Sequence, residues 1–229
     1  MCRLAIICLL CLGLLGGGYV LASETGAPWV SCFEHLPNGE GAWKGPKTVR
    51  TPLVTSADGK LRAYAQIEAK SEGPKNPKGC LNTVRLFVST QRSAGFRQVF
   101  LQKPSLYDGT ANSLGPISWS PNGRWLLVEF LVGSYESDAG GFSILLYDNS
   151  NGKIVEPYFD PMLKTVLKQN CSSWVGRPFH FDSLSRVHLR LSDLIEIGDD
   201  KPLTHCFHGE EEWVFDPGKG TLQNISMIR

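Results

Sequence analysis

The segment His205 to Glu210, which reads His-Cys-Phe-His-Gly-Glu, holds the densest group of side chains that could do chemistry. Imidazole and carboxylate groups bind Zn²⁺ and similar metals, so His205, His208 and Glu210 form a candidate metal site. The two histidines are three residues apart, a spacing that places them on opposite faces of an extended strand. A metal site here would indicate a metal-dependent hydrolase. The other interpretation of the segment is a structural disulfide at Cys206 between two solvated histidines.

A second group of candidate ligands lies in the loop 133–141, where Tyr135, Glu136 and Asp138 could face a bound molecule. Paired carboxylates can also hydrolyse glycosides, but only at a fixed separation that the sequence does not specify. The Gly-x-Ser-x-Gly turn of a serine hydrolase is absent from the chain. We therefore expect a binding site without catalytic residues and without a cofactor.

The first residues combine Arg3 with a long apolar run and end in the small residues of a cleavage site. This pattern is typical of a secretory signal peptide at residues 1–22, with cleavage before Ser23. An uncleaved membrane anchor is the alternative, because the apolar run approaches the ~20 residues of a membrane span. We therefore expect a secreted or periplasmic protein that is bound to a membrane only if this segment is retained.

Removal of the signal peptide leaves residues 23–229, a length that suits one all-β domain. The remaining chain has 22 basic and 22 acidic residues, because Arg3 is lost with the signal peptide. A neutral chain without a basic run lacks the positive surface that displaces counterions from phosphate groups. Nucleic-acid binding is therefore not expected.

Four cysteines remain after residue 22, and they are Cys32, Cys80, Cys171 and Cys206. An even number of cysteines in an exported chain predicts disulfides. Three pairings are possible, and proximity in the sequence favours Cys32 with Cys80 and Cys171 with Cys206. A tetrahedral metal site is the weaker alternative, because no Cys-x-x-Cys spacing occurs. Each disulfide would stabilise the fold by ~2–4 kcal/mol.

Three related turns organise the rest of the chain. Ser-Pro-Asn-Gly-Arg at 120–124 leads into the apolar run 125–132, which indicates a strand buried on both faces. Ser-Ala-Asp-Gly-Lys at 56–60 precedes alternating apolar and polar residues over 61–70, the period of a strand with one wet face. A weaker copy without the Asp-Gly or Asn-Gly pair lies at 182–186. The turns predict three units of similar design.

The predicted units lie at about 51–103, 115–158 and 177–226, after an arm at 23–50 that has no sustained period. One short helix is expected between the second and third units. Asp160 can cap its start, Pro161 can occupy its first turn and Asn170 can end it.

The sequence Ser-Pro-Asn-Gly-Arg-Trp-Leu-Leu-Val at 120–128 resembles the Ser-Pro-Asp-Gly-Lys turn and following strand of TolB-like β-propeller repeats. The segment 56–64 is a looser copy, and the segments 146–154 and 214–222 are similar to the outer hairpin of such a blade. The resemblance implies an all-β fold of three blade-like antiparallel sheets in a partial or small propeller-like arrangement. Closed propellers usually have four to eight blades, so three units leave three possibilities: the arm supplies the missing strands, the units form an open or sandwich-like stack, or a second chain completes the assembly.

We therefore expect an exported, non-enzymatic binding or scaffold protein that recognises a protein or peptide partner of the cell envelope. Loops on a rigid β scaffold usually carry recognition, which assigns this role to the loops 71–82, 108–116, 133–141 and 198–210. Of the tryptophans, Trp119, Trp125 and Trp213 are expected in the core. The positions of Trp29 and Trp43 stay open.

Overall fold

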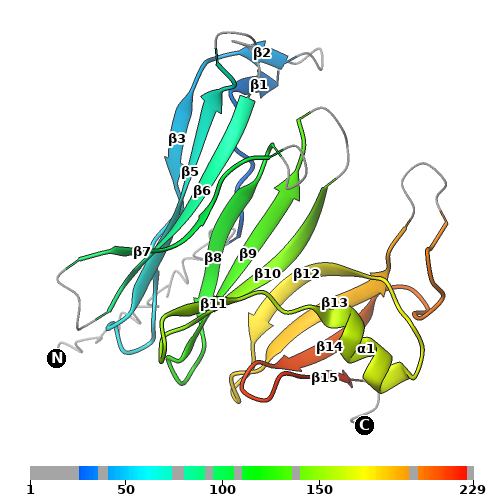
Figure 1. Cartoon of the computed structure of the whole chain (residues 1–229). Coiled ribbons are helices and arrows are strands. Elements are labelled where there is room, and N and C mark those ends of the chain that lie inside the picture. Colours follow the sequence, from blue (N-terminus) through cyan, green and yellow to red (C-terminus); the bar gives the residue numbers. More distant parts are fainter. Residues whose placement is uncertain are drawn as a thin grey trace, which may run out of the picture.

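The computed structural model describes residues 26–35, 41–73, 80–90, 95–105, 110–135, 140–195 and 201–225. The predicted signal peptide and its cleavage site lie outside these residues. The described chain forms three antiparallel sheets that stack on one another, with one helix beside the third sheet (Figure 1). No helix in the described part of the chain has the length and apolar character needed to cross a membrane.

Each sheet is a meander of strands that follow one another in the sequence. The first sheet contains β3 (Lys47–Arg50), β4 (Val54–Thr55), β5 (Arg62–Ser71), β6 (Cys80–Ser89) and β7 (Arg97–Gln102). The middle sheet contains β8 (Ser113–Trp119), β9 (Trp125–Gly133), β10 (Gly140–Asp148) and β11 (Lys153–Val155). The third sheet contains β12 (Ser173–Phe181), β13 (Val187–Asp193), β14 (Glu211–Asp216) and β15 (Thr221–Asn224). A short hairpin of β1 (Phe33–His35) and β2 (Gly41–Trp43) precedes them.

The predicted fold class is confirmed, because the chain is all-β with three blade-like antiparallel sheets and one short helix. Two sheet boundaries differ from the predicted units. The first sheet begins at Lys47, inside the predicted arm, because β3 pairs with the far half of β5. The third sheet begins at Ser173, because β12 extends to the end of the loop that follows the helix.

The middle sheet is buried on both faces, as its apolar run indicated. One face packs against the first sheet through Leu126, Val128, Phe130, Leu145 and Tyr147. The other face packs against the third sheet through Trp125, Leu127, Ile144 and Leu146. Trp119, Trp125 and Trp213 are buried, as predicted. The first and third sheets each bury one face, and Figure 1 shows their strands running in different directions across the stack.

The turns at the start of the first two sheets use the same hydrogen bonds. Between β8 and β9, the Ser120 hydroxyl donates to Asn122 Oδ1 at 2.7 Å and accepts the Trp125 N–H at 2.9 Å. Between β4 and β5, Ser56 makes the equivalent two contacts at 2.6 and 3.0 Å. The repeat seen in the sequence is therefore a repeat of local structure.

The fourth residue of each turn has a positive φ angle. Glycine occupies it in the first two turns, with φ of 73° at Gly59 and 67° at Gly123. In the turn between β12 and β13, Ser185 takes this conformation with φ of 64°. There a single carboxylate replaces the serine and the Asp or Asn of the other turns, since Asp182 Oδ1 accepts the Arg186 N–H at 2.9 Å. The third copy resembles the others only weakly in sequence, because the Asp182 carboxylate accepts the backbone N–H groups of this turn in place of a serine hydroxyl.

The helix α1 (Phe159–Leu167) follows the middle sheet and lies beside the third sheet (Figure 1). The predicted cap is wrong, because Asp160 lies in the first turn of the helix. Its carboxylate accepts the N–H of Ser173 at 3.1 Å and the hydroxyl of Ser173 at 2.7 Å, which joins the helix to the start of β12. The predicted end is also wrong, since Lys168 ends the helix with φ of 61° before Asn170 is reached.

Candidate functional site

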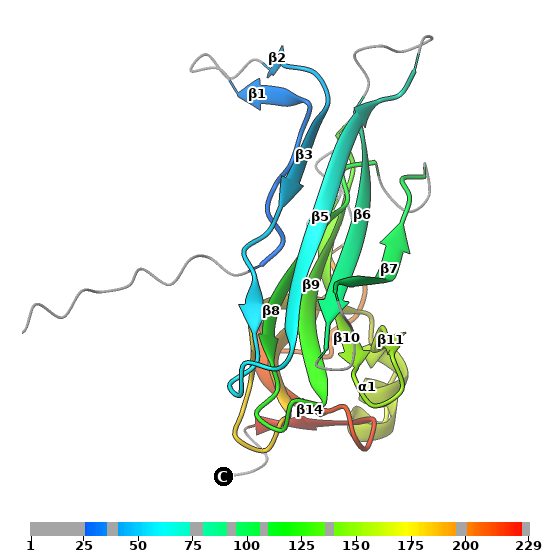
Figure 2. The same cartoon turned by 90° about the vertical axis from the view of Figure 1, so that its left-hand side faces the viewer.

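Residues 26–32 form a strap that crosses the first and middle sheets before the chain turns into β1, as Figure 2 shows in blue. Buried polar side chains hold its backbone. The Asn82 amide donates to the Val30 carbonyl at 2.8 Å, and the Ser113 hydroxyl donates to the Pro28 carbonyl. Asn82 belongs to β6 and Ser113 to β8, so the strap joins two sheets.

The hydroxyl of Tyr135 also holds the strap, at 2.6 Å from the Val30 carbonyl and 2.8 Å from Asn82 Oδ1. Burial raises the pKa of Tyr135 to about 12, although hydrogen bonds oppose this shift. Of the residues predicted to face a ligand in this loop, Tyr135 therefore has an inward, structural contact. Glu136 and Asp138 lie outside the described residues.

The predicted recognition loop 108–116 is not an exposed surface over its residues 111–116. The segment 111–116 is buried, because β8 begins at Ser113 and the strap covers it. A Cβ at Gly115 would lie 1.9 Å from the Gly26 carbonyl oxygen, so only glycine allows this approach of the two backbones.

Glu129 is the one carboxylate in the apolar strand β9, and only 2% of its side chain is exposed. Its Oε1 accepts a hydrogen bond from Arg177 Nε at 2.9 Å and a second from Arg177 Nη2. The backbone N–H of Ala27 in the strap also donates to this carboxylate. Burial raises the pKa of Glu129 above its usual 4.5, and the hydrogen bonds from Arg177 and Ala27 offset this only in part.

Arg177 projects from β12 and is about half exposed, with 51% of its side chain accessible. Its guanidinium lies over the ring of Phe142, 4.4 Å from the ring centroid. Two contacts therefore fix the orientation of this cation, the carboxylate of Glu129 on one side and an aromatic face on the other. Two of its five N–H donors are used on Glu129, which leaves the others directed away from the carboxylate.

Arg177 lines an open cleft of about 740 Å³ where the three sheets meet the strap. We call this the inner cleft. Its lining residues are Gly26, Ala27, Pro28, Trp29, Thr51, Pro52, Ile117, Glu129, Leu131, Phe142, Arg177, Pro178 and Phe179. Most of these side chains are apolar, and Trp29 is 52% exposed at the edge while its ring meets Tyr135 edge-on. The inner cleft can hold an uncharged chain segment and offer it fixed N–H donors.

The sequence contained one sign of this site. Glu129 is the only charged residue in the apolar run 125–132, and a buried carboxylate requires a partner. The partner is 48 residues further along the chain. Neither its identity nor the position of the strap has a local pattern, so the inner cleft was missed.

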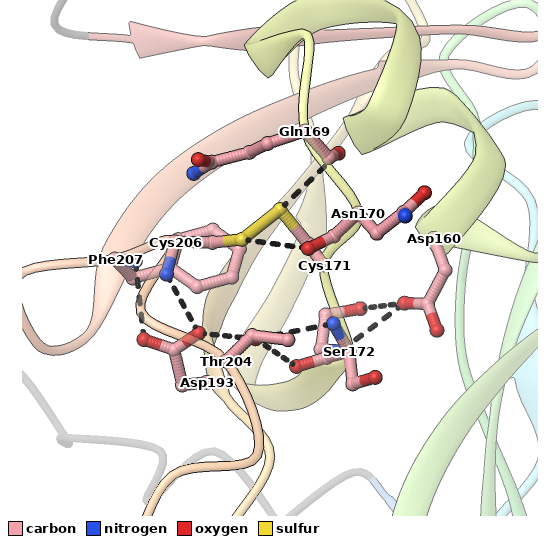
Figure 3. Close-up of a disulfide and its surroundings, with 10 residues drawn as sticks. Asp160, Gln169, Asn170, Cys171, Ser172, Asp193, Thr204, Cys206 and Phe207 are labelled. Carbon is pink, nitrogen blue, oxygen red and sulfur yellow. Dashed lines mark hydrogen bonds between the residues drawn. A yellow bond between two sulfur atoms is a disulfide. The ribbon is translucent and has the colours of Figure 1, made fainter.

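The segment that carries His205 and His208 is folded around Asp193 (Figure 3). The Asp193 carboxylate accepts the Cys206 N–H at 2.9 Å, the Phe207 N–H at 3.1 Å and the Thr204 hydroxyl at 2.7 Å. Burial alone would raise the pKa of Asp193, but these hydrogen bonds outweigh it and hold the pKa below its usual 3.8. The segment is thus held by a carboxylate that accepts three donors.

The predicted metal ligands do not come together. His205 and His208 are exposed, and Glu210 pairs with Arg190 at 3.2 Å. Within the described ranges, no three His, Cys, Asp or Glu side chains are placed to share a metal ion.

Both disulfides favoured by sequence proximity are present. Cys32 is bonded to Cys80, which ties the end of the strap to β6. Cys171 is bonded to Cys206, which ties the segment after α1 to the loop around Asp193 (Figure 3).

No protein-family model and no curated protein matches the chain. Among solved structures, the tricorn protease aligns with a TM-score of 0.38 and 11% identity, over 74% of this chain and 14% of that chain. The acylaminoacyl peptidase of Pyrococcus horikoshii aligns with a TM-score of 0.38 and 15% identity, over 77% of this chain and 24% of that chain. The chain therefore spans less than a quarter of the length of either structure.

Proposed function

We propose that the chain is a non-enzymatic binding protein whose inner cleft takes up an extended peptide segment of a partner protein. The observation that carries this proposal is the Arg177 guanidinium, which is fixed by Glu129 and Phe142 and is still half exposed to the cleft. A donor that is already oriented loses little side-chain entropy when a ligand binds.

The chemistry of the inner cleft favours a neutral peptide over a charged ligand. Glu129 already balances the charge of Arg177, so the remaining N–H donors suit backbone carbonyl oxygens better than a second carboxylate. Ile117, Leu131 and Phe179 supply apolar walls for the side chains of such a segment. Exposed Trp29 supplies an aromatic surface at the edge.

We further propose that the protein is exported to the cell envelope and that its units are TolB-like repeats. The apolar pattern of residues 1–22 and the two disulfides support export, because disulfides persist in oxidising compartments. The shared turn geometry at Ser56 and Ser120 supports the repeat. The partner would then be a protein or peptide of the envelope.

A displayed peptide library tests the proposal. Peptides are selected on the wild-type protein, and the binding of the selected peptides is then measured on an Arg177→Ala variant. We expect enrichment of uncharged peptides with apolar side chains, and about tenfold weaker binding to the variant, because it loses hydrogen bonds from a charged donor. Arg190→Ala is the matched control, since it removes an arginine from the same sheet that is paired with Glu210 outside the cleft.

Circular dichroism and thermal melting of each variant separate loss of binding from loss of fold. A selection that yields no common sequence, or peptides that bind the Arg177→Ala variant as well as they bind the wild type, would contradict the proposal.

A further inference from the structure

Two residues occupy the same position in successive sheets. Tyr147 and Phe215 each lie on the third strand of their sheet, directly before the aspartate that opens the last turn. Each faces the preceding sheet and belongs to the core that it forms there. Their surroundings nevertheless differ. Phe159 of α1 packs edge-on against Phe215, with ring centroids 5.6 Å apart, whereas Tyr147 borders an open cleft of about 800 Å³.

This second cleft, which we call the turn cleft, lies between the first and middle sheets at the end where their turns gather. It is separate from the inner cleft, with which it shares no lining residue. Both Ser-containing turns contribute, with Asp58 and Lys60 from one and Asn122 from the other. The turn between β10 and β11 adds further amide and hydroxyl groups, and the lining also includes Arg97 at the start of β7, Leu61, Val88 and Thr90.

Arg97 is an unbalanced cation in this cleft. Its Nη2 lies 3.4 Å from the Tyr147 hydroxyl, and it has no carboxylate within ion-pair distance in the described part of the chain. The neighbouring cations differ, because Lys60 pairs with Asp58 at 3.3 Å and Arg124 pairs with Asp148 at 3.1 Å. Among the described residues, the turn cleft therefore has one positive charge without a carboxylate partner.

Tyr147 has an unused donor at the same place. The residue is 1% exposed, and its hydroxyl oxygen receives the contact from Arg97. Its own proton has no acceptor among the described residues, and a buried hydroxyl normally finds one. A guanidinium and a phenol O–H that converge on one spot call for an acceptor oxygen there. A carboxylate suits this pair, since it accepts two donors at once.

We propose that the turn cleft binds a small acidic sugar, with its carboxylate on Arg97 and the Tyr147 hydroxyl. The remaining lining fits the rest of such a ligand. Asn122 and Asn149 also line the cleft, and the side-chain N–H groups of both can donate to sugar hydroxyls, while the Asn122 oxygen is used within its own turn. A nucleotide fits less well, because the Tyr147 ring is buried and presents its hydroxyl edge to the cleft in place of a stacking face.

Titration of the full-length mature protein with glucuronate, glucose and glucose 6-phosphate, followed by amide NMR shifts or calorimetry, tests this proposal. We expect saturable binding of glucuronate and none of glucose at the same concentration. Arg97→Gln should weaken glucuronate binding by about tenfold or more, as expected for loss of a charged hydrogen bond. Tyr147→Phe should weaken it by a smaller factor and keep the fold, because it removes one oxygen only.

Arg62→Gln is the control for charge alone, because Arg62 is exposed on the outer face of the first sheet over Phe96. It should leave glucuronate binding unchanged. If glucose 6-phosphate bound more tightly than glucuronate, the ligand group on Arg97 and Tyr147 would be a phosphate and not a carboxylate. That result would overturn this part of the proposal. Absence of glucuronate binding, equal weakening by Arg62→Gln and Arg97→Gln, or binding of an acidic tripeptide in place of both acidic sugars would overturn it entirely.

Discussion

The interface between the first and middle sheets and the interface between the middle and third sheets are built from different chemistry. The first contains the strap and the buried side chains of Asn82 and Ser113 that hold its backbone, and the turn cleft lies at the end where the turns gather. The second is an apolar core that α1 covers with Phe159 and Leu163, and the Glu129–Arg177 pair and the inner cleft lie at its margin beside the strap. The middle sheet contributes one face to each. The comparison indicates that the apolar core of the second interface mainly supplies stability, while the groups suited to binding lie at its margin beside the strap and in the turn cleft of the first interface.

The largest expected effect tests the apolar interface. Trp213 is fully buried there, and Trp213→Ala should lower the free energy of unfolding by about 3–5 kcal/mol, because a large side chain leaves a cavity in a packed core. Urea unfolding followed by circular dichroism measures this change. Trp29→Ala is the control, since Trp29 is 52% exposed and its loss should cost much less. Equal costs for the two variants would remove the distinction between the packed apolar core and the strap.

A pH series separates two carboxylates, Glu129 beside the strap and Asp193 at the end of β13, by the sign of their response. The pKa of Glu129 is raised in the fold by burial, so folded protein binds the proton more tightly than unfolded protein. Stability from this group is therefore present below pH 4.5 and is lost as the pH rises through the folded pKa. Glu129→Gln should remove that loss. A wild-type protein and a Glu129→Gln variant with parallel profiles above pH 4.5 would contradict the raised pKa.

Asp193, the last residue of β13 in the third sheet, should respond with the opposite sign. Burial alone would raise its pKa, but the three hydrogen bonds that it accepts keep the pKa below 3.8. Its contribution is present above this pH and is lost as the pH falls through the folded pKa. Thermal melts of Asp193→Asn across the same series should show a smaller loss at acidic pH than the wild type.

The smallest expected effect concerns the turns that the sheets share. Ser185 has the positive φ angle that glycine takes in the other two turns, and a Cβ is strained there. Ser185→Gly should raise the free energy of unfolding by about 0.5 kcal/mol, since relief of strain exceeds the extra entropy of glycine in the unfolded chain. Ser183→Gly in the same turn, where φ is not positive, should destabilise slightly. Destabilisation by both would show that Ser185 is not strained.

The three sheets could be predicted because their causes are local. The alternation in residues 61–70 and the apolar run 125–132 each report which faces are buried, and the Ser56 and Ser120 turns mark where strands begin. The disulfides followed from proximity in the sequence. The helix cap failed because Asp160 bonds to Ser173 in the next strand, a tertiary contact that overrides the local preference.

The candidate sites could be predicted only in small part. Tyr135 was predicted to face a ligand, but its hydroxyl holds the strap. The environment of Arg97 depends on Tyr147, 50 residues away and in another sheet. Such pairs have no spacing that a sequence pattern can express, because the stacking of the sheets creates them.

The strap also sets an order of assembly. The carbonyl of Val30 is held by Asn82 and Tyr135, and the second of these contacts spans 105 residues. Synthesis proceeds from the N-terminus, so residues 26–32 emerge well before the strands that hold them. The strap therefore cannot take its native position until the middle sheet has been made, although it is among the first parts of the described chain to appear. Its closure is a late, long-range step of the kind that slows folding.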